Sequence, residues 1–130
     1  MKIAIFENEF HLVKIAFDAV NTIYYNDTLQ FKVYKKSQDL KTIEKIKNYD
    51  LIIVDIDLSS KSQMNGFEII KSLKENNIDK PIIVLTGSSK IKEQLDEMNF
   101  SHIPIIIKPI TYSELYEKLN KYLPSSKVTN

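Results

Sequence analysis

The stretch Leu51-Ile52-Ile53-Val54-Asp55 is a run of four aliphatic residues that ends abruptly in a carboxylate. Apolar runs of this length are typical of strands that are buried on both faces, as in parallel sheets. Three other short apolar runs also lead into polar side chains: Ile3–Phe6 into Glu7-Asn8-Glu9, Ile82–Leu85 into Thr86, and Ile103–Ile107 into Lys108-Pro109. If all four runs are parallel strands of one sheet, their polar ends meet and form one site.

The composition indicates one compact domain, because 130 residues with 43% hydrophobic and 27% charged side chains suit a single core. No stretch approaches the roughly 20 apolar residues that a membrane-spanning helix needs. The N-terminus enters a strand-like run without a signal-peptide pattern, so we expect a cytoplasmic protein. Cysteine is absent, which excludes disulfides, thiolate metal ligands and cysteine nucleophiles.

The charge is nearly balanced, with 18 basic and 17 acidic residues and a net charge of +1. Every basic residue is a lysine. A dedicated DNA reader usually has a marked basic excess and arginines that contact bases or phosphates in pairs of hydrogen bonds. We therefore expect no direct binding to nucleic acid.

Strand-like runs alternate five times with segments whose apolar residues recur at helical spacing. Residues 29–34 alternate apolar with polar side chains, which predicts an edge strand with one wetter face. Ser37 is the expected cap of the second helix, and Thr111 with Glu114 forms a capping-box pattern at the last one. The apolar residues expected to face the core are Leu12, Ile15, Ala16, Ala19, Val20 and Ile23 in the first helix, Leu40, Ile43 and Ile46 in the second, Phe67, Ile69, Ile70 and Leu73 in the third, Ile91, Leu95 and Met98 in the fourth, and Leu115, Leu119 and Tyr122 in the fifth.

This alternation predicts an α/β fold, in which a doubly wound, five-stranded parallel sheet is covered by helices on both faces. Ligands of such folds bind beyond the carboxyl ends of the strands. The polar residues that follow the apolar runs all fall at this edge. We therefore expect the functional site there.

The order of these motifs resembles the receiver domain of bacterial two-component response regulators, of the chemotaxis-regulator type. That family has an acidic cluster after the first strand, an aspartate after the third, a threonine or serine after the fourth and Lys-Pro after the fifth. The matching residues are Glu7-Asn8-Glu9, Asp55, Thr86 and Lys108-Pro109. We expect a receiver domain at residues 1–123 and a polar C-terminal tail at 124–130. The resemblance implies a (βα)5 flavodoxin-like fold with strand order 2-1-3-4-5.

The resemblance implies that Asp55 is the phosphoacceptor, which takes a phosphoryl group from a phosphohistidine and becomes an acyl phosphate. Lys108 would pair with the acceptor carboxylate and then with the phosphoryl group. The Thr86 hydroxyl would hydrogen-bond a phosphoryl oxygen. The peptide bond between Lys108 and Pro109 is expected to be cis, and a trans bond would count against an active lysine geometry.

Mg²⁺ is the cofactor that the resemblance implies, with side-chain oxygens from Glu7, Asn8 and Asp55 and the backbone carbonyl of Asp57 as its ligands. The family usually has two adjacent acidic residues where this chain has Glu7-Asn8. The lower charge predicts weak, millimolar Mg²⁺ binding. Glu9 is a candidate to compensate, and a surface role for Glu9 is the alternative.

Two further departures concern the loop after Asp55 and the fifth strand. The loop contains Ser59-Ser60-Lys61-Ser62-Gln63 and is longer than is usual in the family. It either alters access to the site or is a neutral insertion, and we favour the neutral insertion. Ile105 occupies the position of the family's aromatic switch residue, so coupling to the outer surface is expected to be weaker or to run differently. The expected output surface is formed by the fourth helix, fifth strand and fifth helix, with Ile91, Leu95 and Tyr112.

We therefore expect a signalling switch and not an enzyme. The implied partners are a sensor histidine kinase or histidine phosphotransfer protein and a downstream protein target, with a homodimer through the output surface as an open alternative. The sequence has no visible linker to an effector domain. It is therefore expected to act as a stand-alone regulator or phosphorelay intermediate, provided that it is the whole natural product.

Two other interpretations stay open. The first is a pseudo-receiver that binds proteins without being phosphorylated, which Asn8 and Ile105 suggest. The second is a small flavin or nucleotide enzyme with the same sheet order, but with Gly66 and Gly87 as its only glycines the chain lacks a phosphate-cradling loop. His11 and His102 have no paired ligand motif and are expected to be structural or exposed.

Overall fold

The structure is a computed structural model that describes residues 1–125. The predicted polar tail at 124–130 therefore lies mostly outside the described residues. The strands are β1 (Lys2–Phe6), β2 (Gln30–Tyr34), β3 (Leu51–Asp55), β4 (Ile82–Thr86) and β5 (Ile105–Ile107). They form one sheet in the order β2-β1-β3-β4-β5 with every pairing parallel, which confirms the predicted fold class and strand order.

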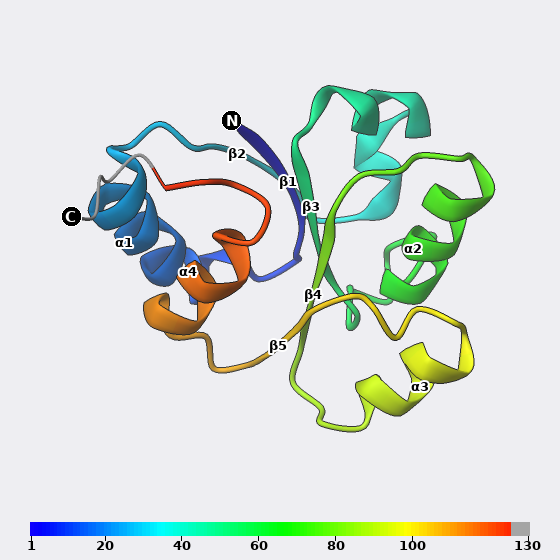
Figure 1. Cartoon of the computed structure of the whole chain (residues 1–130). Coiled ribbons are helices and arrows are strands. Elements are labelled where there is room, and N and C mark those ends of the chain that lie inside the picture. The colour runs from blue at the N-terminus through cyan, green and yellow to red at the C-terminus, as the bar shows by residue number, and fades with distance from the viewer. Residues whose placement is uncertain (126–130) are drawn as a thin grey trace.

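Helices cover both faces of the sheet (Figure 1). The helices α1 (Lys14–Tyr25) and α4 (Tyr112–Leu119) lie on one face, and α2 (Gly66–Glu75) and α3 (Ile91–Glu97) lie on the other. Each face has its own hydrophobic core, because successive side chains of the central strands point to opposite sides. Every residue of β3 and β4 is buried, as their continuous apolar sequences predict. Within residues 1–125 no helix is long and apolar enough to cross a membrane.

The predicted buried face of the first helix is partly wrong. Leu12 and Ile15 are 67% and 83% exposed. Leu12 belongs to a 3-10 turn, η1 (Phe10–Leu12), that precedes the helix. The ring of Phe17 is fully buried and fixes the inward face of α1, and Ile15 lies about 200° around the helix from it. Ile23 is also exposed, whereas the buried residues of α1 are Ala16, Phe17, Val20 and Tyr25.

The second predicted helix is replaced by two 3-10 turns, η2 (Ser37–Leu40) and η3 (Ile43–Asn48). The chain breaks between them because Lys41 has a positive φ of 71° and Thr42 is extended. Ser37 begins η2 and does not cap it, although Leu40 and Ile46 are buried as predicted. The β-branched pair Thr42-Ile43 disfavours a continuous helix at this point.

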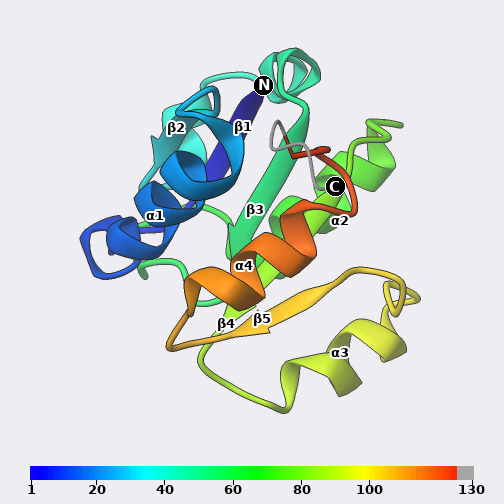
Figure 2. The same ribbon diagram turned by 60° about the vertical axis from the view of Figure 1, so that its left-hand side comes forward.

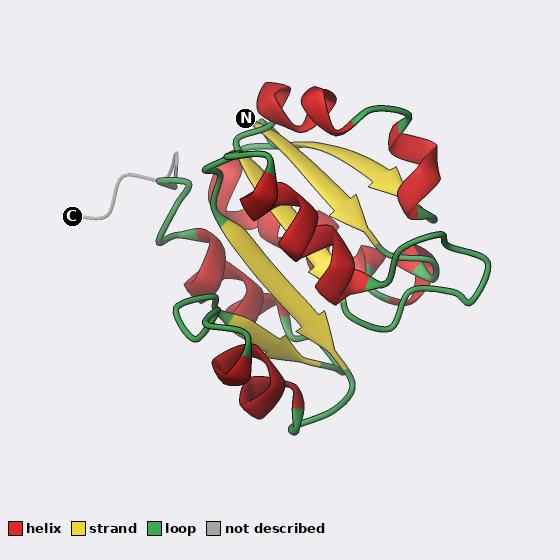
Figure 3. Ribbon diagram, turned by 90° about the vertical axis from the view of Figure 1, so that its right-hand side faces the viewer, coloured by secondary structure: helices red, strands yellow, loops and turns green. Residues whose placement is uncertain are grey.

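The serine-rich loop between β3 and α2 is bonded to η2. The Met64 N–H donates to the Ser37 hydroxyl at 2.9 Å, and the Ser37 N–H donates to the Ser62 hydroxyl at 2.8 Å. The Gln38 side chain donates to the carbonyl of Lys61 and accepts from the N–H of Gln63, both at 2.9 Å. Figure 3 shows this loop projecting beyond the strand ends. These bonds hold the loop against the segment that replaces the second helix.

The last helix packs on α1, and the two run side by side in both Figure 1 and Figure 2. The Thr111 side chain accepts from the Glu114 N–H at 3.2 Å, which is one half of the predicted capping box. The Tyr25 hydroxyl donates to the carbonyl of Leu123 at 2.6 Å. Tyr24 and Tyr116 stack with ring centroids 3.7 Å apart. These contacts fix the chain after α4 to the first helix.

Candidate functional site

Three ionisable side chains from distant parts of the sequence meet at the carboxyl edge of the sheet. Asp55 is the last residue of β3, while Glu7 and Lys108 directly follow β1 and β5. The Lys108 Nζ lies 2.6 Å from the Glu7 Oε2 and 3.0 Å from the Asp55 Oδ2. One ammonium therefore bridges two carboxylates, and their formal charges sum to −1.

Asp55 is almost completely enclosed, with 2% of its surface exposed. Its Oδ1 accepts the backbone N–H of Asp57 at 2.9 Å, and its Oδ2 accepts from Lys108. Asp57 itself is exposed, and its hydrogen bond to the Asp55 carboxylate comes from its backbone N–H. Each Asp55 oxygen already has one donor and keeps a second lone pair for another partner.

Glu7 is fully buried and lies in the same cluster. Its Oε1 accepts the Glu9 N–H at 3.0 Å, and its Oε2 accepts from Lys108. Burial raises the pKa of Glu7, and the hydrogen bond from Lys108 offsets this only in part. Burial alone would lower the pKa of Lys108, but its bonds to Glu7 and Asp55 outweigh burial and raise it. The lysine thus stays charged at neutral pH.

Thr86 ends β4 and is fully buried. Its hydroxyl accepts the Ser88 N–H at 3.0 Å. The Lys108 N–H donates to the Thr86 carbonyl at 2.7 Å, so the backbones that carry the two side chains are joined. The peptide bond between Lys108 and Pro109 is cis, as expected.

The oxygen atoms at this edge of the sheet are of the chemical types that bind Mg²⁺, because Mg²⁺ prefers carboxylate, amide and carbonyl oxygens. Two carboxylates, from Glu7 and Asp55, come together there, and Asn8 beside them is partly exposed. Within residues 1–125 no three acidic, histidine or cysteine side chains are grouped to hold a metal ion. The site therefore offers a divalent cation less negative charge than three carboxylates would.

Gly66 has a role at the site that the sequence pattern did not reveal. A Cβ on Gly66 would lie 2.6 Å from both the Asp55 carbonyl oxygen and the Ile56 Cα. The first turn of α2 therefore packs directly on the backbone of Asp55 and Ile56. The only hint in the sequence was a glycine at the end of the long loop, just before a helical pattern.

The prediction for the output surface is wrong at two residues. Ile91 and Leu95 are 6% and 1% exposed and pack in the core beneath α3. Tyr112 and Ile107 are 46% and 45% exposed, so these are the large apolar side chains on the outer surface of α4 and β5. Ile105 is partly buried and pairs with Val84 of β4.

Comparison with known proteins agrees with this geometry. The family described as response regulator receiver domain matches residues 5–120. The cell cycle response regulator CtrA of Brucella ovis is 26% identical over 99 residues, which is 75% of this chain and 41% of that protein. The chain thus spans less than half the length of the curated relatives that it matches.

Solved receiver domains share the fold. The BeF3-activated N-terminal receiver domain of Klebsiella pneumoniae RstA superposes with a TM-score of 0.74 at 19% identity, covering 95% of this chain and 99% of that one. The non-phosphorylated HemR receiver domain of Leptospira biflexa gives a TM-score of 0.73 at 18% identity, with 99% and 98% covered. By its sequence match over residues 5–120, this chain belongs to the response regulator receiver domain family.

Proposed function

We propose that this domain accepts a phosphoryl group on Asp55 from a sensor histidine kinase or histidine phosphotransfer protein and signals through a phosphorylation-dependent protein interaction. The observation that carries the proposal is the Lys108 ammonium, which lies 3.0 Å from Asp55 and 2.6 Å from Glu7. A buried carboxylate held by a fixed cation at the carboxyl edge of a parallel sheet suits nucleophilic attack on phosphorus.

The chain's own residues account for most of this chemistry. An Asp55 oxygen attacks phosphorus, the bond from phosphorus to the donor histidine nitrogen breaks, and an acyl phosphate forms. Lys108 stabilises the charge that the phosphoryl group brings, because the ammonium already faces the carboxylate. The Thr86 hydroxyl accepts the Ser88 N–H at 3.0 Å and donates to the Ser88 carbonyl at 3.5 Å, a long bond that it can exchange for one to a phosphoryl oxygen.

Mg²⁺, when bound by oxygens of Glu7, Asn8 and Asp55 and the carbonyl of Asp57, would neutralise charge on the phosphoryl oxygens. Lys108 already occupies one lone pair on each carboxylate. We therefore propose weak Mg²⁺ binding, with the lysine as a resident cation that lessens the need for the metal. Glu9 contributes its N–H to Glu7, and its exposed side chain is assigned to the surface.

An exposed apolar surface beside the site supports docking of the phosphodonor. Leu12 and Ile15 from η1 and α1 are among the most exposed large apolar residues in the described chain, and Tyr112 is 46% exposed. With Ile110 they line a hollow of about 350 Å³. Because Pro109 and Ile110 directly follow Lys108, a helical donor on this surface would be close to Asp55. A phosphodonor that docks here must share a compartment with this protein, and we propose that this compartment is the cytoplasm.

The test is incubation with acetyl phosphate and Mg²⁺, followed by intact-mass measurement. The parent chain should gain one phosphoryl group, and Asp55→Asn should gain none. Asp96→Asn is the matched control, because it makes the same substitution at an exposed aspartate on α3, outside the site, and should leave phosphorylation unchanged. No mass gain in the parent chain, or an equal gain in Asp55→Asn, contradicts the proposal.

One observation favours a second candidate, a pseudo-receiver that binds partners without phosphate. In the described chain Asn8 leaves two carboxylates at the site, and both are already paired with Lys108. In that case the mass would not change even with a kinase present, while the partner would bind Asp55→Asn as well as the parent chain. The same assay therefore separates the two functions.

A further inference from the structure

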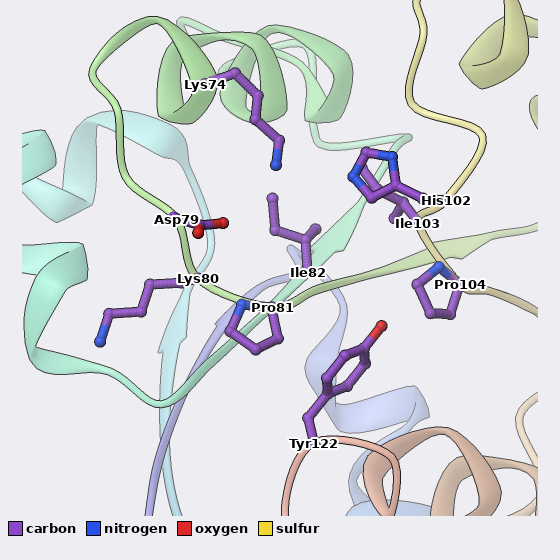
Figure 4. A pocket seen from close by; sticks show the side chains of 9 residues that line it. All are labelled: Lys74, Asp79, Lys80, Pro81, Ile82, His102, Ile103, Pro104 and Tyr122. Atoms are coloured by element: carbon purple, nitrogen blue, oxygen red, sulfur yellow. The ribbon is translucent and has the colours of Figure 1, made fainter.

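A second site candidate lies at the opposite edge of the sheet from Asp55. A hollow of about 360 Å³ opens at the amino ends of β4 and β5, where Ile82 begins one strand and Pro104 precedes the other. Figure 4 shows the residues that line it. The hollow is lined by Lys74, Asp79, Lys80, Pro81, Ile82, His102, Ile103, Pro104 and Tyr122.

Four polar side chains from four different segments converge on this hollow. Lys74 comes from the last turn of α2, Asp79 from the connection to β4, His102 from the turn before β5 and Tyr122 from the chain after α4. Figure 4 shows the Lys74 ammonium, the Asp79 carboxylate and the Tyr122 hydroxyl directed toward the space around Ile82, with the His102 ring beside it. The Lys80 ammonium points away from that space.

These four side chains are available to a ligand. Within residues 1–125 none of them takes part in an ion pair or a side-chain hydrogen bond, whereas Lys71, one turn before Lys74, pairs with Glu75 at 3.9 Å. The hollow thus presents a fixed positive charge, two further hydrogen-bond donors and one carboxylate acceptor. Its floor is apolar, since Ile82 and Ile103 are 4% and 5% exposed.

We propose that this hollow binds a small phosphorylated metabolite of about mononucleotide size. Lys74, His102 and Tyr122 supply donors for a phosphate group, and bonds to charged groups are the stronger ones. Asp79 repels a bare polyanion but accepts hydrogen bonds from sugar hydroxyls or an amino group. Pro81, Pro104 and the Tyr122 ring offer flat apolar surfaces for a base.

The size of the hollow limits the ligand. Its volume of about 360 Å³ lies near the lower end of small-molecule sites, which start at about 300 Å³. A single nucleotide fits this range better than a dinucleotide. The proposal is independent of phosphorylation on Asp55, because none of the lining residues belongs to that site.

The test is an NMR titration of the ¹⁵N-labelled chain with AMP, and with adenosine and inorganic phosphate as separate arms. AMP should shift the amide resonances of Lys74, Asp79, His102 and Tyr122 in a saturable way. Adenosine and phosphate should each bind more weakly, because each lacks one half of the recognition. Absence of saturable shifts at these residues with millimolar AMP overturns the proposal, as does phosphate that binds as tightly as AMP.

Two lysine variants sharpen the test. Lys74→Ala should weaken AMP binding by about tenfold or more, given the usual strength of hydrogen bonds to charged groups. Lys71→Ala removes the same charge from the same helix outside the hollow and should leave the affinity unchanged. Equal loss in both variants means general attraction to a basic surface and overturns the site. Both spectra without ligand should retain the dispersion of the folded parent chain.

Discussion

Replacing Lys108 by methionine tests the electrostatic basis of the site. The substitution keeps a long unbranched side chain but removes the only ammonium that faces Glu7 and Asp55 in the described chain. The two carboxylate side chains are 1% and 3% exposed, so water cannot replace the lost partner. Removing one partner of a buried ion pair typically costs about 3 to 5 kcal/mol.

The Lys108 side chain is 28% exposed, which screens part of the interaction and places the expected loss near the lower value, about 3 kcal/mol. A domain of this size has a free energy of unfolding of about 5 to 15 kcal/mol, so Lys108→Met should still fold. Urea denaturation at neutral pH measures the difference. Lys92→Met, on the exposed surface of α3, makes the same change in net charge and should cost little.

The pH dependence gives a second readout. Without the ammonium, burial raises the pKa of Glu7 further. A carboxyl group with a raised pKa in the folded state destabilises the fold when it ionises, so the folded state is most stable in acid, where Glu7 is protonated. The free energy of unfolding that Lys108→Met loses relative to the parent chain should therefore be smallest in acid. It should grow as the pH rises through the Glu7 titration. Mg²⁺ should stabilise this variant more than the parent chain. A variant as stable as Lys92→Met, or a loss that is independent of pH, would refute the reasoning.

Three further predictions concern the backbone, the core and the metal. Gly66→Ala should lower the free energy of unfolding by about 2 kcal/mol in urea denaturation, because its methyl group meets the backbone of Asp55, whereas Gly87→Ala, with no atom within 4 Å, should have little effect. Burial raises the pKa of Tyr25 from 10.0 to about 12, so its neutral hydroxyl contributes fully to the free energy of unfolding below about pH 10, and this contribution is lost between about pH 10 and 12. Tyr25→Phe should reduce the loss of stability over this pH range in thermal melts, and an unchanged dependence of stability on pH would contradict this. Asn8→Asp should tighten Mg²⁺ binding on the order of tenfold in calorimetric titration, and an unchanged affinity would exclude Asn8 from the ligands.

The sheet could be predicted because each buried strand carries its own signal. The run Leu51–Asp55 predicts both the strand and the residue at which it ends, and the run Ile82–Thr86 does the same. The convergence of Glu7, Asp55 and Lys108 then follows from parallel topology, since the carboxyl ends of such strands share one edge. Local sequence was sufficient wherever burial on both faces left no choice of orientation.

Prediction failed where two orientations had similar apolar content. The first helix has aliphatic residues on opposite sides, and only packing of Phe17 against the rings of Phe10 and Phe31 decides which side faces inward. The segment after Ser37 has helical spacing, but the positive φ of Lys41 breaks the helix. The close approach at Gly66 is a tertiary contact that no local pattern contains.

The bonds between η2 and the serine-rich loop carry a consequence for how the region beside Asp55 moves. Composition alone would suggest a loose tether, yet Ser37 and Gln38 fasten residues 61–64 through both backbone and side-chain atoms. We therefore expect the segment after β2 and residues 61–64 to move together. A partner that binds η2 would therefore also act on the loop that connects Asp55 to α2.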